Sequence, residues 1–301
     1  MYKKSAVLTF YAETPIHMGS GQSVSYVDLP IQRERHTSFP VLWSSGIKGV
    51  IRDLASRVWN DKNKVETIFG PEDGSSDFAS CISITDAKIL LYPVRSVKGV
   101  FAWITCPFVL KRFKEDLNAV GINFKYNDQD IKILDVPDDK VFIASDNLKI
   151  QGQDKVALEE FVFEAEVKNE VKELAGFLKN FVHQNDLTKD LGNHLAIVSD
   201  NVFKDFVNYA VEIRTRIRID QTKGTVKEGA LFSEELIPSE SVFYSILFFK
   251  DSFKPGSNMD AQKVFSEINS LLSDNSILQL GGDETTGKGY VRVKVFNGGQ
   301  T

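Results

Sequence analysis

A connection of roughly 30 residues joins the first strand-like segment of this chain to its first helical segment, between His17 and Asp53, where compact domains commonly use about 2–6 residues. Connections that long are usually either disordered or functional. Disorder fits poorly here, because the connection is rich in apolar side chains that a solvated linker lacks. These are Val24, Tyr26, Val27, Leu29, Ile31, Phe39, Val41, Leu42 and Trp43. The sequence therefore predicts an ordered, functional loop.

Two side chains of this loop have the chemistry of catalysis. His17, in TPIHMGSG, is a candidate general base, and Asp28, in YVDLPIQRE, is a candidate base or metal ligand. Each also has an ordinary interpretation, His17 as a polar loop residue and Asp28 as a turn former before Leu-Pro. Arg33 and Arg35 add a basic cluster. Spacing alone makes neither His17 nor Asp28 catalytic.

The helix that follows the loop begins SSGIKGVIRD and combines features of an anion site. Ser44 or Ser45 is the expected N-cap, and the first turn of a helix offers free N–H groups and the positive end of the dipole. Lys48 and Arg52 are four residues apart, so they share one helix face. A solvated basic face would show the same charge pattern.

Composition leaves a polyanionic partner open. The chain has 301 residues, 42% apolar and 26% charged, which is ordinary for a globular protein with a substantial core. Its net charge is −5, but basic residues cluster before residue 60 and again over 214–227, RTRIRIDQTKGTVK. Because charges are screened beyond ~8 Å, a basic face on an acidic chain still attracts polyanions.

The location of the protein follows from what the sequence lacks. Cys81 and Cys106 have no metal-ligand spacing and are expected to be buried free thiols. The N-terminal run alternates and reaches Glu13, which is typical of a strand rather than a signal peptide. No segment approaches the ~20 apolar residues that span a bilayer. A cytoplasmic location is expected.

Periodicity predicts a mixture of strands and helices. Strands are expected over 5–13, 81–94, 100–106, 212–220, 241–249, 277–282 and 290–296. Helices are expected over 43–59, 62–70, 107–121, 166–182, 201–210 and 259–273, with a β-rich insertion over 122–165. The order strand, helix, two strands, insertion, helix, strand resembles an elaborated βαββαβ core, so the expected fold class is α+β, ferredoxin-like.

Near the C-terminus, GGDETTGKGYVRV imitates a P-loop. Gly282 to Lys288 fits G-x-x-x-x-G-K, but Gly289 replaces the Ser/Thr that binds magnesium, and a strand follows instead of a helix. A tight turn between two strands is the plain interpretation. The loop also suits phosphodiester binding, since glycines such as Gly282 and Gly287 let backbone N–H groups approach closely and Lys288 supplies charge.

A basic strand precedes a long hairpin. In EIRTRIRID, strict alternation places Arg214, Arg216 and Arg218 on one face. The turn TKGT and the acidic segment SEELIP complete a charged hairpin over about 212–249. An edge hairpin with protective charges would look the same.

Together these segments resemble the RAMP superfamily of CRISPR-associated proteins, and most closely the backbone subunits of type III-B (Cmr) effector complexes. The matching segments are TPIHMGSG, VDLPIQRE with FPVLWSSGIKGVIRD, IRIDQTKGTVKEGALFSEELIP and GGDETTGKGYVRV. They occur in the same order from Thr14 to Val293, whereas the middle of the chain has no matching motif.

The resemblance implies a modified RRM-like palm built from 1–110 and 200–301, a β-hairpin thumb at about 212–249, and an inserted α/β lobe at 111–199. Such subunits stack head to tail into a helical oligomer, join other subunits of the type III-B complex, bind guide (CRISPR) RNA along the palm, and displace nucleotides at regular intervals.

The resemblance also implies roles for single residues. Asp28 corresponds to the aspartate that cuts paired target RNA, with a divalent metal such as Mg²⁺, and His17 to a histidine beside it. Either Glu234 or Glu235 is expected to reach the cleavage site of a neighbouring subunit. The RNA backbone is expected to contact Ser44, Ser45, Lys48, Arg52, Arg214, Arg216, Arg218, Gly282, Gly287 and Lys288.

The chemistry agrees with this resemblance. Attack by a 2′-hydroxyl needs an in-line geometry that an A-form duplex forbids, so a displaced nucleotide supplies the freedom. Guide pairing would select the sequence while the protein contacts backbone and shape. Two alternatives stay open: a purely structural RNA-binding subunit with catalysis elsewhere, and a stand-alone guide-processing nuclease.

Overall fold

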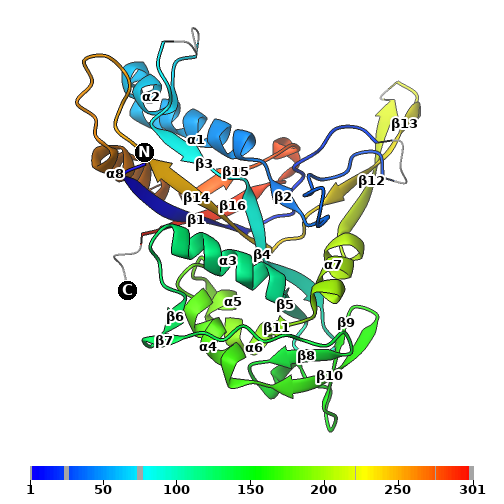
Figure 1. The fold of residues 1–301 in the computed structure, drawn as a ribbon. Coiled ribbons are helices and arrows are strands. Elements are labelled where there is room, and N and C mark those ends of the chain that lie inside the picture. The colour runs from blue at the N-terminus through cyan, green and yellow to red at the C-terminus, as the bar shows by residue number, and fades with distance from the viewer. Residues whose placement is uncertain (1, 24–26, 73–76, 221, 275, 298–301) are drawn as a thin grey trace.

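A computed structural model describes residues 2–23, 27–72, 77–220, 222–274 and 276–297 (Figure 1). Within these ranges, the side chains of a few residues also lie outside the description, namely Arg218, Asp220, Lys227, Glu228, Ala230 and Asp274. The fold is α+β, as the sequence predicts. In the described part of the chain, no helix combines the length and apolar character that crossing a membrane requires.

Four antiparallel strands form one end of a large mixed sheet. Their order is β16-β1-β14-β4, with β15 beside β16. The bounds are β1 Lys4–Ala12, β4 Ala87–Arg95, β14 Val242–Phe249, β15 Ile277–Gln279 and β16 Tyr290–Phe296. Short strands β2 (Val41–Leu42) and β3 (Ile82–Ile84) pair with β4 and β14. The strand expected over 5–13 is thereby confirmed.

Helices cover both faces of this end of the sheet (Figure 1). One face carries α1 (Ser44–Trp59), α2 (Lys62–Phe69) and α8 (Ala261–Asp274), and the other carries α3 (Pro107–Ala119). Phe249 of β14 packs on Phe265 of α8, whereas Tyr244 of the same strand packs on Phe113 of α3. Covering both faces explains why β1 is buried without interruption from Ala6 to Ala12.

The sheet continues beyond β4 into the middle of the chain, in the order β5-β11-β8-β10-β9. These strands are β5 Phe101–Thr105, β8 Lys140–Ile143, β9 Lys155–Leu158, β10 Phe161–Val167 and β11 Leu195–Ile197. The small hairpin β6 (Lys125–Tyr126) and β7 (Gln129–Asp130) stands apart, and the remaining helices are α4 Asn169–Leu178, α5 Asp186–Lys189, α6 Leu191–His194 and α7 Asp200–Tyr209. A single sheet therefore runs through both halves.

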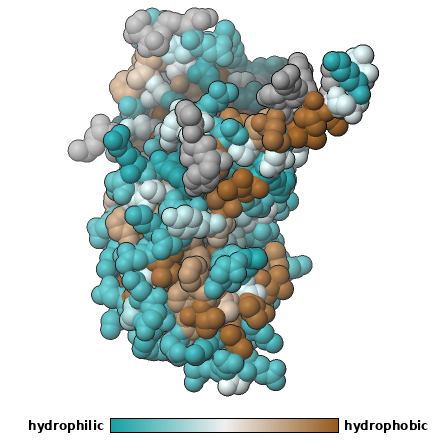
Figure 2. All heavy atoms as spheres, turned by 90° about the vertical axis from the view of Figure 1, so that its right-hand side faces the viewer, coloured by the Kyte–Doolittle hydropathy of each residue, from teal (hydrophilic) through white to brown (hydrophobic). Residues whose placement is uncertain are grey.

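A two-stranded hairpin projects from the body (Figure 1). Its strands are β12 Glu212–Asp220 and β13 Thr225–Leu236. We call it the projecting hairpin. One of its faces holds exposed aliphatic side chains, which Figure 2 shows as apolar surface along the arm; they are Ile213, Ile217, Ile219, Val226 and Leu231.

The structure corrects several predicted boundaries. The hairpin ends at Leu236 rather than near 249, because β14 leaves it to pair with β1. The segment SEEL accordingly lies on β13 near its base. The strand expected over 81–94 is split into β3 and β4 around Thr85, whose hydroxyl accepts from the Ile246 amide. The helix expected from 166 begins at Asn169, since β10 extends to Val167.

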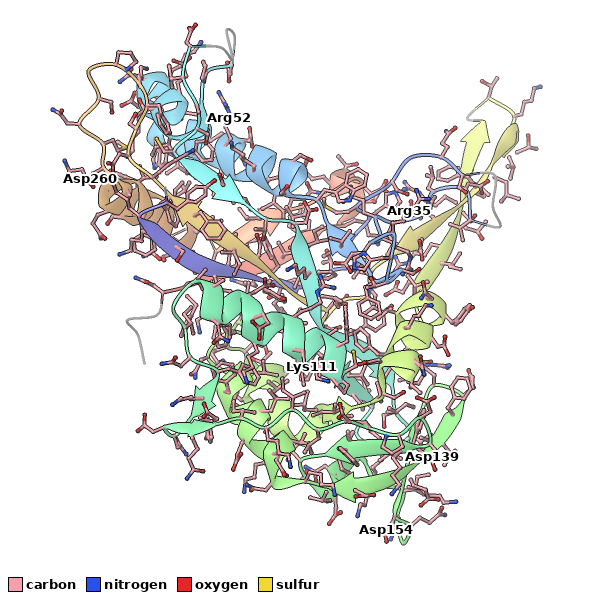
Figure 3. The ribbon with its side chains drawn as sticks, viewed as in Figure 1. Arg35, Arg52, Lys111, Asp139, Asp154 and Asp260 are labelled. Carbon is pink, nitrogen blue, oxygen red and sulfur yellow. The ribbon has the colours of Figure 1, made fainter. Side chains whose placement is uncertain are left out.

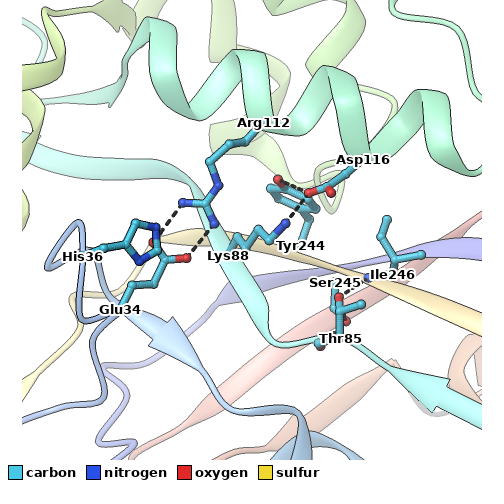
Figure 4. A network of polar contacts seen from close by, with 9 residues as sticks. All are labelled: Glu34, His36, Thr85, Lys88, Arg112, Asp116, Tyr244, Ser245 and Ile246. Carbon is cyan, nitrogen blue, oxygen red and sulfur yellow. Dashed lines mark hydrogen bonds and ion pairs between the residues drawn. The ribbon is translucent and has the colours of Figure 1, made fainter.

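A polar network fastens the long loop to the body (Figure 4). Both guanidinium nitrogens Nη1 and Nη2 of Arg112, on α3, donate to the two carboxylate oxygens of Glu34, at 2.9 and 2.6 Å. Burial raises the pKa of Glu34, but the hydrogen bonds from Arg112 and Thr37 outweigh it and leave the pKa below its usual value. Further along α3, Asp116 accepts from Lys88 and Tyr244.

Candidate catalytic loop and nucleic-acid interface

The loop between β1 and α1 is ordered by pairing with the base of the projecting hairpin. Ile16 exchanges backbone hydrogen bonds with Ile237, and Leu29 forms a parallel bridge with Glu234. Within the loop, Gly19 bridges to Ile31. Its apolar side chains are buried, including Ile16, Met18, Val27, Ile31, Phe39, Val41 and Leu42. The prediction of an ordered loop is confirmed, although Val24 and Tyr26 lie outside the described residues and Trp43 is exposed.

Asp28 is exposed and held by Ser233 of β13. Its Oδ2 accepts from the backbone N–H of Ser233 at 2.8 Å and from the hydroxyl at 2.9 Å. The same hydroxyl lies 3.1 Å from the amide nitrogen of Asp28. The backbone hydrogen bond first, and the hydroxyl second, lower the pKa of Asp28. The carboxylate is therefore ionised at neutral pH, with Oδ1 accepting no hydrogen bond from another described residue.

His17 lies in the same loop and contacts the same strand, β13, two residues beyond Ser233. Its Nδ1 is 2.8 Å from the carbonyl oxygen of Glu235. A carbonyl can only accept, so Nδ1 carries the proton and the lone pair of the neutral ring is on Nε2. A side chain at Gly19 would begin 2.9 Å from that Nε2. The ring is largely buried, and glycine at position 19 leaves its Nε2 edge free of a covering side chain.

Glu235 is fully engaged within its own chain. Its carboxylate forms an ion pair with Arg33 and accepts from the Ile31 amide at 2.9 Å. Arg33 in turn donates to the carbonyls of Ser38 and Val207. Glu235 thus organises the loop, and the basic cluster expected from Arg33 and Arg35 is reduced to the exposed Arg35 (Figure 3).

Glu234 points to the opposite side of β13 and is only 1% exposed. Arg216 Nη1 donates to its Oε2 at 2.9 Å and also contacts the carboxylate of Asp283. These contacts raise the pKa of Arg216. Burial raises the pKa of Asp283, but hydrogen bonding and charge from Arg216 outweigh it and lower the pKa overall. Arg216 thereby joins the projecting hairpin to the glycine-rich loop, the connection between β15 and β16 that contains Asp283.

Two of the three arginines expected to bind RNA are therefore already paired with carboxylates. Arg214 donates to Glu212 at 2.8 Å, and Arg216 is shared between Glu234 and Asp283. Both lie on the face of β12 opposite Ile213 and Ile217, as alternation predicts. The side chain of Arg218 lies outside the described residues.

Lys48 and Arg52 lie on α1 with little compensating charge. Lys48 is half-buried and forms no hydrogen bond or ion pair with the described residues. Burial lowers the pKa of Lys48, and the charges of Arg52 and Lys250 lower it further. Arg52 points away from the sheet (Figure 3), 3.7 Å from Glu72, and its buried Nη2 has no described acceptor. An unpaired buried donor costs about 1–3 kcal/mol, which an incoming anion would recover.

The N-terminus of α1 differs from the prediction. Neither Ser44 nor Ser45 is the N-cap, because the helix begins at Ser44 and Trp43 is the residue before it, with no side-chain cap. The Ser44 amide instead donates to the Asp86 carboxylate at 2.7 Å. One first-turn N–H group is thus taken by an acidic side chain of the chain itself.

The glycine-rich loop joins β15 to β16 and packs against the His17 loop. Gly281 has φ +81°, and a Cβ there would lie 2.2 Å from the His17 carbonyl oxygen. The amide of Gly282 donates to that oxygen, and the amide of Gly287 to the Glu284 carbonyl. These N–H groups already have acceptors within the chain, so they do not form the predicted backbone site for a phosphate. The side chain of Lys288 remains for the predicted phosphate contact.

A complete metal site is not preformed in the part of the chain that the structure describes. No three or more His, Cys, Asp or Glu side chains gather there in a way that could hold an ion. Asp28 offers one open oxygen. A single carboxylate fits the mode in which Mg²⁺ is bound by one or two protein oxygens together with substrate phosphates.

Ser233 and Asp283 are site residues that the sequence analysis missed. Both lie inside segments it singled out, SEELIP, which begins with Ser233, and GGDETTG. A weak signal existed for Asp283, since an aspartate that follows two glycines can adopt the left-handed conformation it has here, φ +62°. Nothing in the sequence pairs Ser233 with Asp28, because 205 positions separate them.

Comparison with known proteins agrees with this geometry. The RAMP superfamily model matches residues 9–292. The chain is 39% identical over 310 residues to the CRISPR system Cmr endoribonuclease Cmr4 of Pyrococcus furiosus, covering 99% of each. It superposes on oligomeric Cmr4 from the same organism with TM-score 0.73 and 33% identity, covering 98% of both chains. A chain of the type III-B Cmr-beta in its apo state gives TM-score 0.75 at 25% identity, again covering 98% of both. The chain belongs to the RAMP superfamily.

Proposed function

We propose that this chain is a guide-RNA-binding backbone subunit of a type III-B CRISPR effector complex that also cleaves target RNA at regular intervals. The observation that carries the catalytic part is Asp28: an exposed, ionised carboxylate held in an ordered loop by Ser233. The Pyrococcus relative is named an endoribonuclease, which supports the catalytic role. The same relative forms an oligomer, which supports the role of a repeated backbone subunit.

The strand order supports a ferredoxin-like palm. Elements β1, α1, β4, β14, α8 and β16 follow one another as βαββαβ, and the order β16-β1-β14-β4 is that expected of such a core. In this proposal β14, rather than β5, takes the place beside β1. The projecting hairpin is the thumb, and the chain from α3 to β11 is the inserted lobe. Successive copies would stack head to tail.

The site divides the work among its residues. A carboxylate with a lowered pKa is a weak proton acceptor, so Asp28 suits holding a cation better than removing a proton. His17 presents Nε2 as the acceptor, because its Nδ1 is committed to Glu235. Ser233 and Glu235 are two residues apart, about 7 Å along an extended strand. Asp28 and His17 are therefore bound to nearby residues of β13, and we propose that the displaced nucleotide lies beside them.

A divalent cation, proposed as Mg²⁺, would be held by the open Oδ1 of Asp28 together with phosphate oxygens of the RNA. Such an ion, if bound, would supply Lewis-acid stabilisation of developing negative charge on the phosphate. His17 Nε2 would take the proton of the attacking 2′-hydroxyl as the bond from phosphorus to the 5′-oxygen breaks, and the leaving 5′-oxygen would take a proton from solvent. Either Glu234 or Glu235 is proposed as the glutamate that assists, and each would exchange its own arginine, Arg216 or Arg33, for the RNA.

Lys48 and Arg52 are proposed to hold the guide backbone. Their weakly compensated charge lies about one turn apart on α1, and phosphate contacts of this kind position RNA without selecting its sequence. Lys288 of the glycine-rich loop and the Ser44–Ser45 helix start would add further contacts.

The decisive experiment compares Asp28→Asn with Asp53→Asn in the assembled complex. Asp53 is an exposed carboxylate of α1 paired only with Arg57, so it controls for loss of one charge. We expect Asp28→Asn to reduce cleavage of complementary RNA by about 10²–10⁴-fold while target binding stays unchanged. Full cleavage at every site in the Asp28→Asn complex would assign the chain a purely structural role.

A further inference from the structure

A cluster of aromatic and basic side chains lies where β14 ends, beside the N-terminus of β1. Lys250 follows the last residue of β14, and its Nζ lies 5.3 Å from the centroid of the Tyr2 ring and 4.8 Å from that of Phe253. Tyr2 and Phe253 are 44% and 53% exposed. Two aromatic rings are thus presented to solvent around one lysine. We call this set, with Lys48 and Arg52, the aromatic ledge.

The Tyr2 ring is fixed in place, unlike an ordinary surface tyrosine. Its hydroxyl is 2.6 Å from the Ser83 Oγ, and its ring packs on Phe248 with centroids 5.0 Å apart. Fixing the ring removes most of the entropy cost of using it in a contact. The exposed part of this fixed ring is therefore available to a ligand at small entropy cost.

Two of the three cations of the aromatic ledge are uncompensated. Lys250 and Lys48 form no ion pair with the described residues, whereas Arg52 has a long ion pair, 3.7 Å, with the exposed carboxylate of Glu72. Lys48 and Lys250 are also close enough to repel one another. By contrast, the partly buried Arg33, Arg112 and Arg216 each contact a carboxylate at shorter distance. The two lysines of the ledge therefore lack an anion.

We propose that the aromatic ledge binds an unpaired RNA nucleotide, with its base stacked on Tyr2 or Phe253 and its phosphates on Lys48, Arg52 and Lys250. Every base has a π face, so stacking on exposed rings beside a basic track is the usual way proteins hold single strands. When the base stacks on a ring, the Lys250 ammonium moves from the ring face to the phosphate. This inference rests on the RNA binding of the proposed function and adds residues that bind bases rather than the backbone alone.

The test measures binding of a single-stranded RNA that carries 2-aminopurine, whose fluorescence is quenched on stacking. Tyr2→Ala and Phe253→Ala should each weaken binding about tenfold and reduce the quenching, leaving the slope of log K against log salt unchanged. Lys250→Gln should instead lower that slope by about one. Tyr2→Phe should behave like the unaltered chain, because it keeps the ring.

Tyr209→Ala is the matched control, since Tyr209 is the most exposed tyrosine among those described, at 79%, and lies on α7 away from the ledge. It should leave affinity and quenching unchanged. If Tyr2→Ala and Phe253→Ala also leave both unchanged while the unaltered chain binds RNA, the ledge is not a stacking site and the proposed function stands.

Two further outcomes would also overturn the proposal. The first is equal competition by polyglutamate and by an unlabelled RNA. That result would show that the ledge recognises negative charge alone. No binding of RNA by the unaltered chain would remove the RNA-binding part of the proposed function, and the ledge with it. Circular dichroism of each variant identifies any loss of folding, and Phe253→Leu, which keeps an apolar side chain, should still lose the quenching.

Discussion

At the scale of single residues, the site depends on one strand segment. Ser233, Glu234 and Glu235 are consecutive, and each has a different partner: Asp28, Arg216 and Arg33. Alternation along β13 sends Glu234 to one side and its two neighbours to the other. The two adjacent glutamates, which the sequence could not tell apart, are thereby distinguished.

The pH dependence of the cleavage rate in Ser233 variants tests this arrangement. The Ser233 hydroxyl is the second largest cause of the lowered pKa of Asp28, after the backbone N–H. Ser233→Ala should therefore raise the pKa of Asp28 part of the way to its ordinary value. In the proposed mechanism cleavage needs the ionised carboxylate, so the acid limb of the pH–rate profile should move to higher pH.

Ser233→Thr keeps the hydroxyl and should leave that limb where it is. A profile that moves equally in both variants would mean that strand packing, not the hydrogen bond, sets the acid limb. The measurement is the cleavage rate of a fixed RNA substrate from well below the ordinary pKa of an aspartate, about 3.9, up to neutral pH.

Prediction from the sequence succeeded for placement, where the pattern is local. The structure contains the ordered loop that carries Asp28, the helix face shared by Lys48 and Arg52, and the strand face shared by Arg214 and Arg216. Prediction failed where a partner is remote: Asp86 satisfies the start of α1, and Asp283 satisfies Arg216. Such partners depend on how the strands are ordered in the sheet, which no local pattern encodes.

At the scale of elements, the loop is held to α3 by the ion pair of Glu34 and Arg112, which is mostly buried and bidentate. Arg112→Met should lower the free energy of unfolding by about 2 kcal/mol, because it leaves a largely buried carboxylate without its partner. Lys111→Met, one position earlier, removes only an exposed contact with Asp135 and should change it by less than about 0.5 kcal/mol.

The loss of unfolding free energy in Arg112→Met should become smaller as the pH falls. The pKa of Glu34 is lowered in the folded chain, so its contribution is present above the unfolded-state pKa and disappears as pH falls through the folded one. The difference between the unaltered chain and Arg112→Met should therefore shrink on acidification. Urea titrations at neutral and acidic pH measure it, and a constant difference would refute the ionic origin.

Element boundaries in the sequence analysis erred for physical reasons. Predicted strand 81–94 continues through Thr85 in its apolar pattern, and both of its parts pair with β14. The ladder is interrupted between them, because the register shifts between Ile84, opposite Leu247, and Lys88, opposite Tyr244. The predicted hairpin 212–249 joined three strand-like runs in sequence. Hydrophobicity distinguishes them, because β14 is buried throughout most of its length and β12 is mostly exposed.

At the scale of the whole molecule, a continuous sheet argues against two independent folding units. β4 pairs with β14 on one side and β5 on the other, so it belongs to both halves. Calorimetry should show one transition with equal calorimetric and van't Hoff enthalpies. Two resolved transitions would instead support the inserted lobe at 111–199 as a separate unit.

The position of β1 between β14 and β16 also has a consequence for how the protein is made. Val7 pairs with Ile246 on one side and with Phe296 on the other, so β1 completes its pairing only after β16 has been made. The Asp28 loop depends on a later segment as well, since its anchors lie on β13. A chain interrupted before β16 therefore leaves one edge of β1 unpaired, and a chain interrupted before β13 also lacks the anchors of the Asp28 loop.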